Sequence, residues 1–257
     1  MGVVNVTPDS FSDGGRFLRS EDAVAQGEML VEEGADLLDV GGESSRPGSD
    51  PVDEQEELDR AAPVIEQLAA RVDVPLSIDT YKPSTARACL ALGASIVNDI
   101  SGFGDPAMTA ATAEAGAAAV IMHMRGRPKT MQSEPRYDDV VGEVKAFLVD
   151  RALAVERGGV ECIVVDPGLG FGKTAQHNFE ILRRLGEFGE IGRPLLIGPS
   201  RKSFLGSLPS ALPVEDRLEG TLAAVSIAAV AGARIIRVHD VRQAKRAVEV
   251  VDAVRHG

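Results

Sequence analysis

Short apolar runs alternate with helix-like stretches along the whole chain. The first run, residues 1–5, ends at Asn5, and the second, residues 37–40, includes Asp39. Residues 23–33 and 54–72 follow these runs and carry apolar positions at roughly helical spacing. The pattern therefore predicts one strand followed by one helix as the repeating unit.

The same unit recurs six more times. Further apolar runs end at Asp79, Asn98, His123, Asp166, Gly198 and His239, and helical patterns cover residues 83–92, 106–115, 140–157, 215–230 and 242–254. Such alternation indicates parallel strands joined by crossover helices. Eight units in about 250 residues is the size of a (β/α)8 TIM barrel. We predict this α/β fold as a single domain over residues 1–257, with an open doubly wound sheet as the alternative.

Composition and charge exclude several classes of protein. The formal net charge of −12 argues against a nucleic-acid partner, because a phosphate backbone requires a dense cationic surface. No apolar run is long enough to cross a membrane, and no basic segment precedes an apolar one at the N-terminus. Cys89 and Cys162 are the only cysteines, which fits a reduced, cytoplasmic protein.

Polar residues gather where the predicted strands end. In a barrel these ends surround one mouth, which carries the active site. The residues at the ends are Asn5, Asp39, Asp79, Asn98, His123, Asp166, Arg237 and His239. Any one of them is more simply a helix cap or loop residue. The whole set predicts a binding site, because acids and amides dominate the middle strands and cations the last two.

Two stretches carry the sharpest chemical signals. In IVVDPGLGFGK, a strand ends in Asp166 and a glycine-rich loop that could bring bare backbone to a ligand, although an ordinary turn is the alternative. In GPSRKSF, Arg201 and Lys202 precede the start of a short helix near Ser203. The last two strands of such barrels often bind phosphate, so an anionic ligand is expected there. Asp166 with Asn98 suits the edge of an aminopyrimidine-like ring, and Lys202 could serve a carbonyl of that ring in place of a phosphate.

The loops resemble those of the dihydropteroate synthase family, one of the pterin-binding barrels. The motifs that carry the likeness are NVTPDSFSDGG, GGESSRPG, SIDT, VNDI, HMRGRPKTMQ, DPGLGFGK, GPSRKSFLG and RVHD, in order along essentially the whole chain. The resemblance implies a transferase of folate biosynthesis. It would join 6-hydroxymethyl-7,8-dihydropterin diphosphate to 4-aminobenzoate, with Mg²⁺ required, and release 7,8-dihydropteroate and diphosphate. It also implies a homodimer and a sulfonamide target.

The resemblance assigns a role to each matching position. Asp79, Asn98, Asp166 and Lys202 look like the pterin-binding set, and Arg237 and His239 like the diphosphate-binding pair. Asn5 matches the residue that helps hold Mg²⁺ and diphosphate. The residues that resemble the aminobenzoate site are Phe11, Arg46, Pro47, Phe171, Lys202 and Ser203. Asp79, Lys202 and Arg46 are the expected catalytic residues.

The family mechanism implies an SN1-like loss of diphosphate that leaves a carbocation stabilised by the pterin ring. Residues 6–20 and 42–52 are expected to form mobile lids. The chain begins at its first strand, without the extension that family members usually carry before it. Ser45 and Arg125 depart from the family pattern, which more often has threonine and glutamine there.

Three other functions compete with this one. A corrinoid-linked methyltetrahydrofolate methyltransferase shares the pterin-binding barrel but would lack the diphosphate motifs. A non-catalytic pterin-binding paralogue would be expected to lose its diphosphate residues first, and here they are intact. A sugar-phosphate isomerase would satisfy the fold and the phosphate corner alone, but not the pairing of Asp166 with Asn98.

Overall fold

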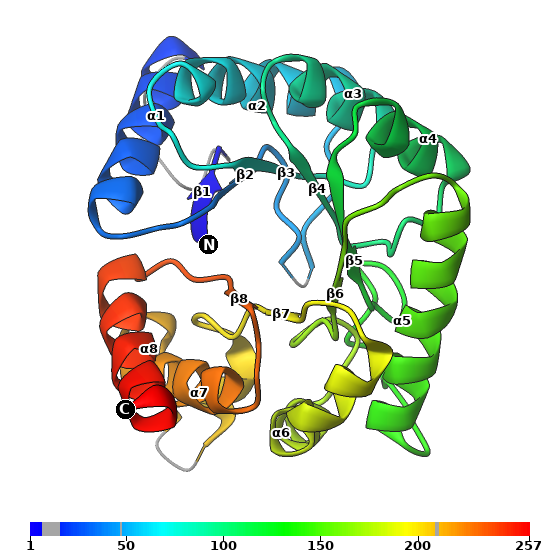
Figure 1. Cartoon of the computed structure of the whole chain (residues 1–257), viewed down its shortest axis with the longest axis vertical. Coiled ribbons are helices and arrows are strands. Elements are labelled where there is room, and N and C mark those ends of the chain that lie inside the picture. The colour runs from blue at the N-terminus through cyan, green and yellow to red at the C-terminus, as the bar shows by residue number, and fades with distance from the viewer. Residues whose placement is uncertain (7–15, 47, 209–210) are drawn as a thin grey trace.

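The computed structural model describes residues 1–6, 16–46, 48–208 and 211–257. Its strands form the inner ring of a barrel and its helices surround them (Figure 1). The strands are β1 (Gly2–Asn5), β2 (Leu38–Gly41), β3 (Leu76–Asp79), β4 (Ile96–Asp99), β5 (Ala118–Met122), β6 (Ile163–Asp166), β7 (Leu196–Ile197) and β8 (Ile235–Ile236). All neighbouring pairs among β1 to β6 are parallel, as is the pair β7 and β8.

Two bridges complete the ring. Val165 of β6 pairs with Leu195, just before β7, and Gly2 of β1 pairs with Val238, just after β8. The second junction is held by hydrogen bonds from Val3 N to Val238 O (3.1 Å) and from Val238 N to Met1 O (3.0 Å). The predicted TIM barrel is confirmed. The doubly wound alternative is wrong, because in an open sheet the segments around β1 and β8 would not pair with each other.

The helices follow the predicted alternation, but α6 lies outside every predicted helical range, and two of the predicted helices differ clearly at their bounds. They are α1 (Arg16–Glu32), α2 (Glu54–Ala69), α3 (Pro83–Ala91), α4 (Pro106–Glu114), α5 (Val140–Arg157), α6 (Ala175–Arg183), α7 (Leu218–Val230) and α8 (Val241–His256). Helix α1 begins seven residues before the predicted start, in a stretch with little apolar periodicity. The predicted helix over residues 215–230 is divided at Arg217 into a 3-10 turn (Val214–Asp216) and α7.

One apolar core lies between the strands and the helices. It includes Val40, Ile78 and Ile121 from the strands and Leu68 and Leu148 from the helices, all with no exposed surface. The buried β-branched side chains fix the strands. Each strand therefore delivers its last polar residue to the same end of the barrel. In the described part of the chain, no helix is long and apolar enough to cross a membrane.

Candidate active site

A cavity of about 470 Å³ opens at the end of the barrel where the strands finish. Ten of the twelve predicted site residues line it: Asn5, Arg46, Asp79, Asn98, Asp166, Phe171, Lys202, Ser203, Arg237 and His239. The other two, Phe11 and Pro47, lie outside the described residues. Residues from seven different strands or their loops thus meet in one place, although 234 positions separate the first from the last.

A chain of charged and amide groups crosses the floor of this cavity. The guanidinium of Arg237 donates from Nε to Asp39 Oδ2 (2.5 Å) and from Nη2 to Asp79 Oδ2 (2.8 Å). Asn98 donates from Nδ2 to the same oxygen of Asp39 (3.1 Å). Burial raises the pKa of Asp79, and the positive charge of Arg237 opposes this rise. One arginine of the loop after β8 therefore holds the carboxylates of two neighbouring strands, β2 and β3, in place.

Asp166 stands at the start of a loop that only glycine can form. Its carboxylate accepts a hydrogen bond from Gly168 N (2.7 Å). Gly168 has φ +69°, and a Cβ there would lie 2.0 Å from His123 O; Gly172 has φ +60°, and a Cβ there would lie 2.2 Å from Arg125 O. The loop consequently packs its bare backbone against the end of β5. Burial raises the pKa of Asp166 to about 6, so a ligand with paired N–H donors would favour its ionised form.

Lys173 anchors the far end of the same loop. Its buried Nζ donates to the backbone oxygens of Gly168 (3.0 Å), Phe171 (3.0 Å) and His123 (3.3 Å). It also lies 2.9 Å from His123 Nδ1, which accepts when the ring proton is on Nε2. Burial lowers the pKa of His123 to about 3 and that of Lys173 to about 7. His123 is thus a neutral partner of Lys173 and does not line the cavity.

Lys202 is placed between the two halves of the predicted site. Its Nζ lies 4.0 Å from the centroid of the Phe171 ring, a cation–π contact. Burial lowers the pKa of Lys202 to about 8, with Arg237 adding to that effect and Asp166 and Asp79 opposing it. The side chain thus carries a positive charge near neutral pH, close to an aromatic wall.

The cationic corner at β7 and β8 is partly neutralised within the protein. Arg201 makes a bidentate pair with Asp240, at 2.6 and 3.0 Å, so its positive charge is partly neutralised by that carboxylate. His239 Nδ1 lies 2.9 Å from Ser200 Oγ. Burial, together with the positive charge of the neighbouring Arg237, lowers the pKa of His239 to about 4. Ser203 opens a 3-10 helix of five residues, which confirms the predicted start of a short helix at this position.

Sequence reasoning left several site residues without a role. Asp39 lies at the end of a predicted strand, but its pairing with Arg237 depends on the closure of β8 onto β1. Lys173 was one letter of a loop motif. Glu43, which also lines the cavity, lies in the GGESS segment. The only sequence signal at Glu43 and Lys173 is a charged residue directly after a glycine.

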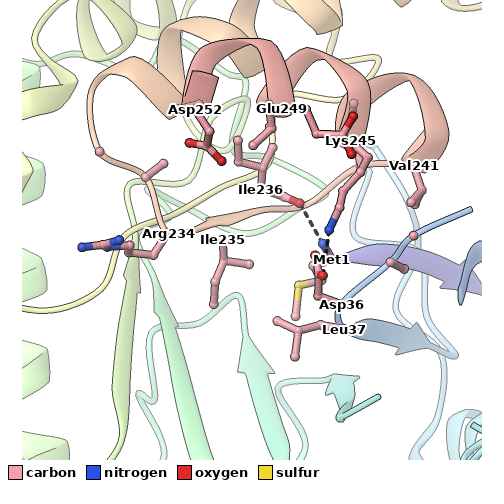
Figure 2. A pocket seen from close by; sticks show the side chains of 18 of the residues that line it. Met1, Asp36, Leu37, Arg234, Ile235, Ile236, Val241, Lys245, Glu249 and Asp252 are labelled. Carbon is pink, nitrogen blue, oxygen red and sulfur yellow. Dashed lines mark hydrogen bonds and ion pairs between the residues drawn. The ribbon is translucent and has the colours of Figure 1, made fainter. Parts of the chain in front are cut away.

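A second cavity lies at the opposite end of the barrel. It has about 420 Å³ and is lined by residues where strands begin and by α8 (Figure 2). There the Met1 amine donates to Ile236 O (3.0 Å), and Lys245 pairs with Asp36 (2.8 Å). It contains none of the predicted site residues, so the functional site is the cavity at the strand ends.

Asn5, the predicted Mg²⁺ ligand, is a single amide at the cavity wall. Within the described ranges, no three His, Cys, Asp or Glu side chains cluster closely enough to hold a metal by themselves. Mg²⁺ is commonly bound through one or two protein oxygens, waters and substrate phosphates. Asn5 therefore fits an ion that binds together with a phosphorylated ligand.

The comparisons with known proteins agree with this geometry. The family model described as pterin binding enzyme matches residues 1–239. The dihydropteroate synthase of Escherichia coli (strain K12) is 48% identical over 255 residues, which cover 98% of this chain and 90% of that protein. The chain belongs to the dihydropteroate synthase family of pterin-binding enzymes.

Solved structures of this family superpose closely on the barrel. A Xanthomonas albilineans dihydropteroate synthase with 4-aminobenzoic acid has a TM-score of 0.94 at 47% identity, with 100% of this chain and 93% of that one covered. A structure of the enzyme from the same organism, in complex with 7,8-dihydropteroate, has a TM-score of 0.90 at 44% identity, with the same coverage. The likeness therefore extends over the whole dihydropteroate synthase barrel and includes the strand ends that form the cavity.

Proposed function

We propose that this chain joins 6-hydroxymethyl-7,8-dihydropterin diphosphate to 4-aminobenzoate and releases 7,8-dihydropteroate and diphosphate. The observation that carries the proposal is the division of one cavity into two chemical halves. Asp79, Asn98 and Asp166 offer carboxylates and an amide, while Arg237 and Lys202 offer cations beside them. A flat heterocycle with an attached diphosphate matches both halves at once.

The acidic half suits the pterin ring. A carboxylate can accept two parallel hydrogen bonds from a ring N–H and an exocyclic NH₂. Asp166 is only 6% exposed, and among the described residues its carboxylate accepts a hydrogen bond only from Gly168 N, so it has acceptor capacity for such an edge. Asn98 and Asp79 lie across the cavity and would bind the remaining polar atoms of the ring.

The cationic half suits the leaving group. The C–O bond between the pterin methylene and the diphosphate breaks, and its electron pair leaves with the diphosphate. Arg237 and His239 would bind the departing oxygens, and Asp79 would favour the positive charge that develops on the pterin. Asn5 would hold Mg²⁺ together with diphosphate oxygens. When bound, that ion supplies neutralisation of the leaving group's charge.

The second substrate then attacks without a covalent enzyme intermediate. The lone pair of the aromatic amine forms the C–N bond, and the amine proton is released. Arg46, Lys202, Phe171 and Ser203 line the side of the cavity where 4-aminobenzoate would lie. We assign Phe171 to contact with the ring, and Arg46 and Ser203 to the carboxylate, with Phe11 and Pro47 completing this subsite.

The test is product formation by the purified chain. Diphosphate release is measured with Mg²⁺ and the pterin diphosphate, with and without 4-aminobenzoate. The organic product is identified by its mass in mass spectrometry. Dihydropteroate that requires both substrates is the expected result. Tight binding of the pterin diphosphate without any product would instead indicate a pterin-binding paralogue.

We further propose that the chain acts as a cytoplasmic, single-domain subunit of a homodimer. Support for the single domain comes from the main hydrophobic core, whose residues extend from Val4 to Ala244. Support for self-association comes from α7, where Ile227 and Val230 are 47% and 62% exposed. Sedimentation of the wild type beside Val230→Glu tests this, because a dimer through α7 should dissociate in the variant.

A further inference from the structure

One largely buried lysine contacts both ends of the loop that carries Arg46. Residues 42–52 connect β2 to α2 and include Ser44, Ser45 and Arg46 of the cavity wall. Lys82 lies outside this loop, directly before α3, and its Nζ reaches both ends of it. It contacts the Glu43 carboxylate (Oε2, 2.6 Å) at the start of the loop and Val52 O (2.6 Å) at its end.

The ammonium group of Lys82 has all of its protons used. A third contact, to Glu57 Oε2 of α2 (2.8 Å), completes one acceptor for each of its three N–H bonds. Glu57 is 1% exposed, Glu43 9% and Lys82 14%, so the cluster is shielded from water. A largely shielded charge that makes three short contacts fixes its neighbours, because removing it leaves the buried carboxylate of Glu57 and the half-buried carboxylate of Glu43 without this counter-charge.

The partners of Lys82 are themselves fixed from other elements. The Tyr81 hydroxyl donates to Glu43 Oε1 (2.7 Å), and Val52 N donates to Glu43 Oε2 (3.3 Å). The tip of the loop is held by a backbone hydrogen bond from Gly48 N to Pro128 O (3.0 Å) and by Ser49 Oγ, which donates to Ser44 O (2.6 Å). Its charged contact is exposed: Lys129 pairs with Asp50 (2.5 Å), where the two side chains are 65% and 77% exposed. An exposed pair of this kind contributes little, so among the charged contacts those at the base of the loop contribute most to its position.

We propose that Lys82 is a positioning residue for the 4-aminobenzoate subsite, acting through the base of the loop 42–52. The inference rests on the function proposed above. Arg46 depends on the loop for its position, whereas Asp79, Asn98 and Asp166 are placed by strands of the barrel. Loss of the Lys82 contacts should therefore disturb the second substrate more than the first.

The experiment compares Lys82→Met with wild type and with Lys129→Met, which removes a lysine contact at the tip of the same loop. KM for 4-aminobenzoate is measured at saturating pterin diphosphate, and binding of the pterin diphosphate by calorimetry. Lys82→Met should raise KM for 4-aminobenzoate at least about tenfold and leave pterin diphosphate affinity within about threefold. Lys129→Met should change neither by more than about twofold.

Hydrogen exchange of the peptide that covers residues 43–52 supplies a readout independent of activity. Faster exchange is expected there in Lys82→Met, with no change in peptides from β3 and β6. If the wild type makes no product, the proposed function fails while this exchange measurement still tests Lys82.

Unchanged exchange, or an equal loss of affinity for both substrates, would overturn the inference. Tyr81→Phe removes one hydrogen bond from Glu43 and keeps all the charges, so it serves if Lys82→Met does not fold. A smaller effect in the same direction is expected for it, and an unchanged loop and KM would count against the role of this cluster.

Discussion

Arg237 donates to the carboxylate of Asp79 across 2.8 Å, and the same guanidinium contacts Asp39 at 2.5 Å. The residue assigned to diphosphate thus also orients a residue assigned to the pterin. Asp39 is fully buried, and its Oδ1 is without a hydrogen-bond partner in the described part of the protein. The charge of Arg237 is consequently required by the fold as well as by the site.

Replacing Arg237 should cost stability in a pH-dependent way. Arg237→Met leaves two buried carboxylates without a counter-charge, which typically costs about 3–5 kcal/mol. The loss should be larger at pH 8 than at pH 5, because Asp79, whose pKa is raised by burial, escapes the penalty by taking up a proton as the pH falls. Denaturant unfolding at both pH values measures this. Arg201→Met, which breaks the more exposed pair with Asp240, is the control and should cost about 1 kcal/mol or less.

Lys202 should be essential for turnover, and it should support turnover only while its ammonium group is charged. Lys202→Met is expected to reduce kcat by at least about a hundredfold, a typical loss for one electrostatic group in a site. Burial lowers the pKa of Lys202 to about 8. Wild-type kcat/KM should therefore fall as the pH rises above about 8, because the free enzyme then loses the ammonium. Near-normal turnover of the variant at pH 7 would remove Lys202 from the reaction.

Asp166 should destabilise the fold when it is ionised. Burial raises its pKa to about 6 in the folded protein, above the ordinary value of 3.8. Folding stability contributed by this group is therefore greatest at low pH and is lost as the pH rises from about 4 to about 6. Asp166→Asn abolishes that loss. Relative to wild type, the variant should gain about 1 kcal/mol between pH 5 and pH 8.

Unfolding by urea at the two pH values tests the Asp166 prediction, and Asp150→Asn on the exposed side of α5 is the matched control. The same gain in both variants, or none in Asp166→Asn, would contradict a raised pKa. Activity should be lost in Asp166→Asn at both pH values, since the amide replaces one of the two acceptor oxygens by an NH₂ donor and can no longer accept two parallel hydrogen bonds from the pterin edge.

Lys173 should be important for stability although it does not line the cavity. Lys173→Met leaves three backbone oxygens and His123 Nδ1 without their donor, and about 3 kcal/mol of unfolding free energy should be lost. Lys145→Met breaks the surface pair with Glu190 and should cost less than about 1 kcal/mol. Thermal unfolding of both variants decides whether the buried lysine holds the loop.

The strands and their order were predictable from sequence because their burial leaves a strong signal. Runs such as residues 163–166 are buried along their whole length, and four of the runs end in a polar residue that lines the cavity: Asn5, Asp79, Asn98 and Asp166. The start of α1 was not predictable, because its first turns lack periodic apolar positions. The break at Arg217 was missed for a related reason: a 3-10 turn and an α-helix share the same local composition.

The members of the site were predictable from strand ends, but their pairing was not. Asp39 and Arg237 are 198 positions apart and meet only because the barrel closes. The closing of residues 42–52 by Lys82 likewise depends on the packing of α2 against α3. Contacts between side chains from distant strands follow from three-dimensional closure, which no local pattern encodes.

The most direct test of the proposed chemistry is an oxygen label in the bridging position between the pterin methylene and the diphosphate. Turnover by the wild-type chain with 4-aminobenzoate should place all of the ¹⁸O in the released diphosphate, alongside dihydropteroate of the expected mass. That result requires cleavage of the C–O bond and transfer of the dihydropterin, through its methylene carbon, to the amine. Recovery of the label in free pterin alcohol would show cleavage at phosphorus and would contradict the proposed reaction.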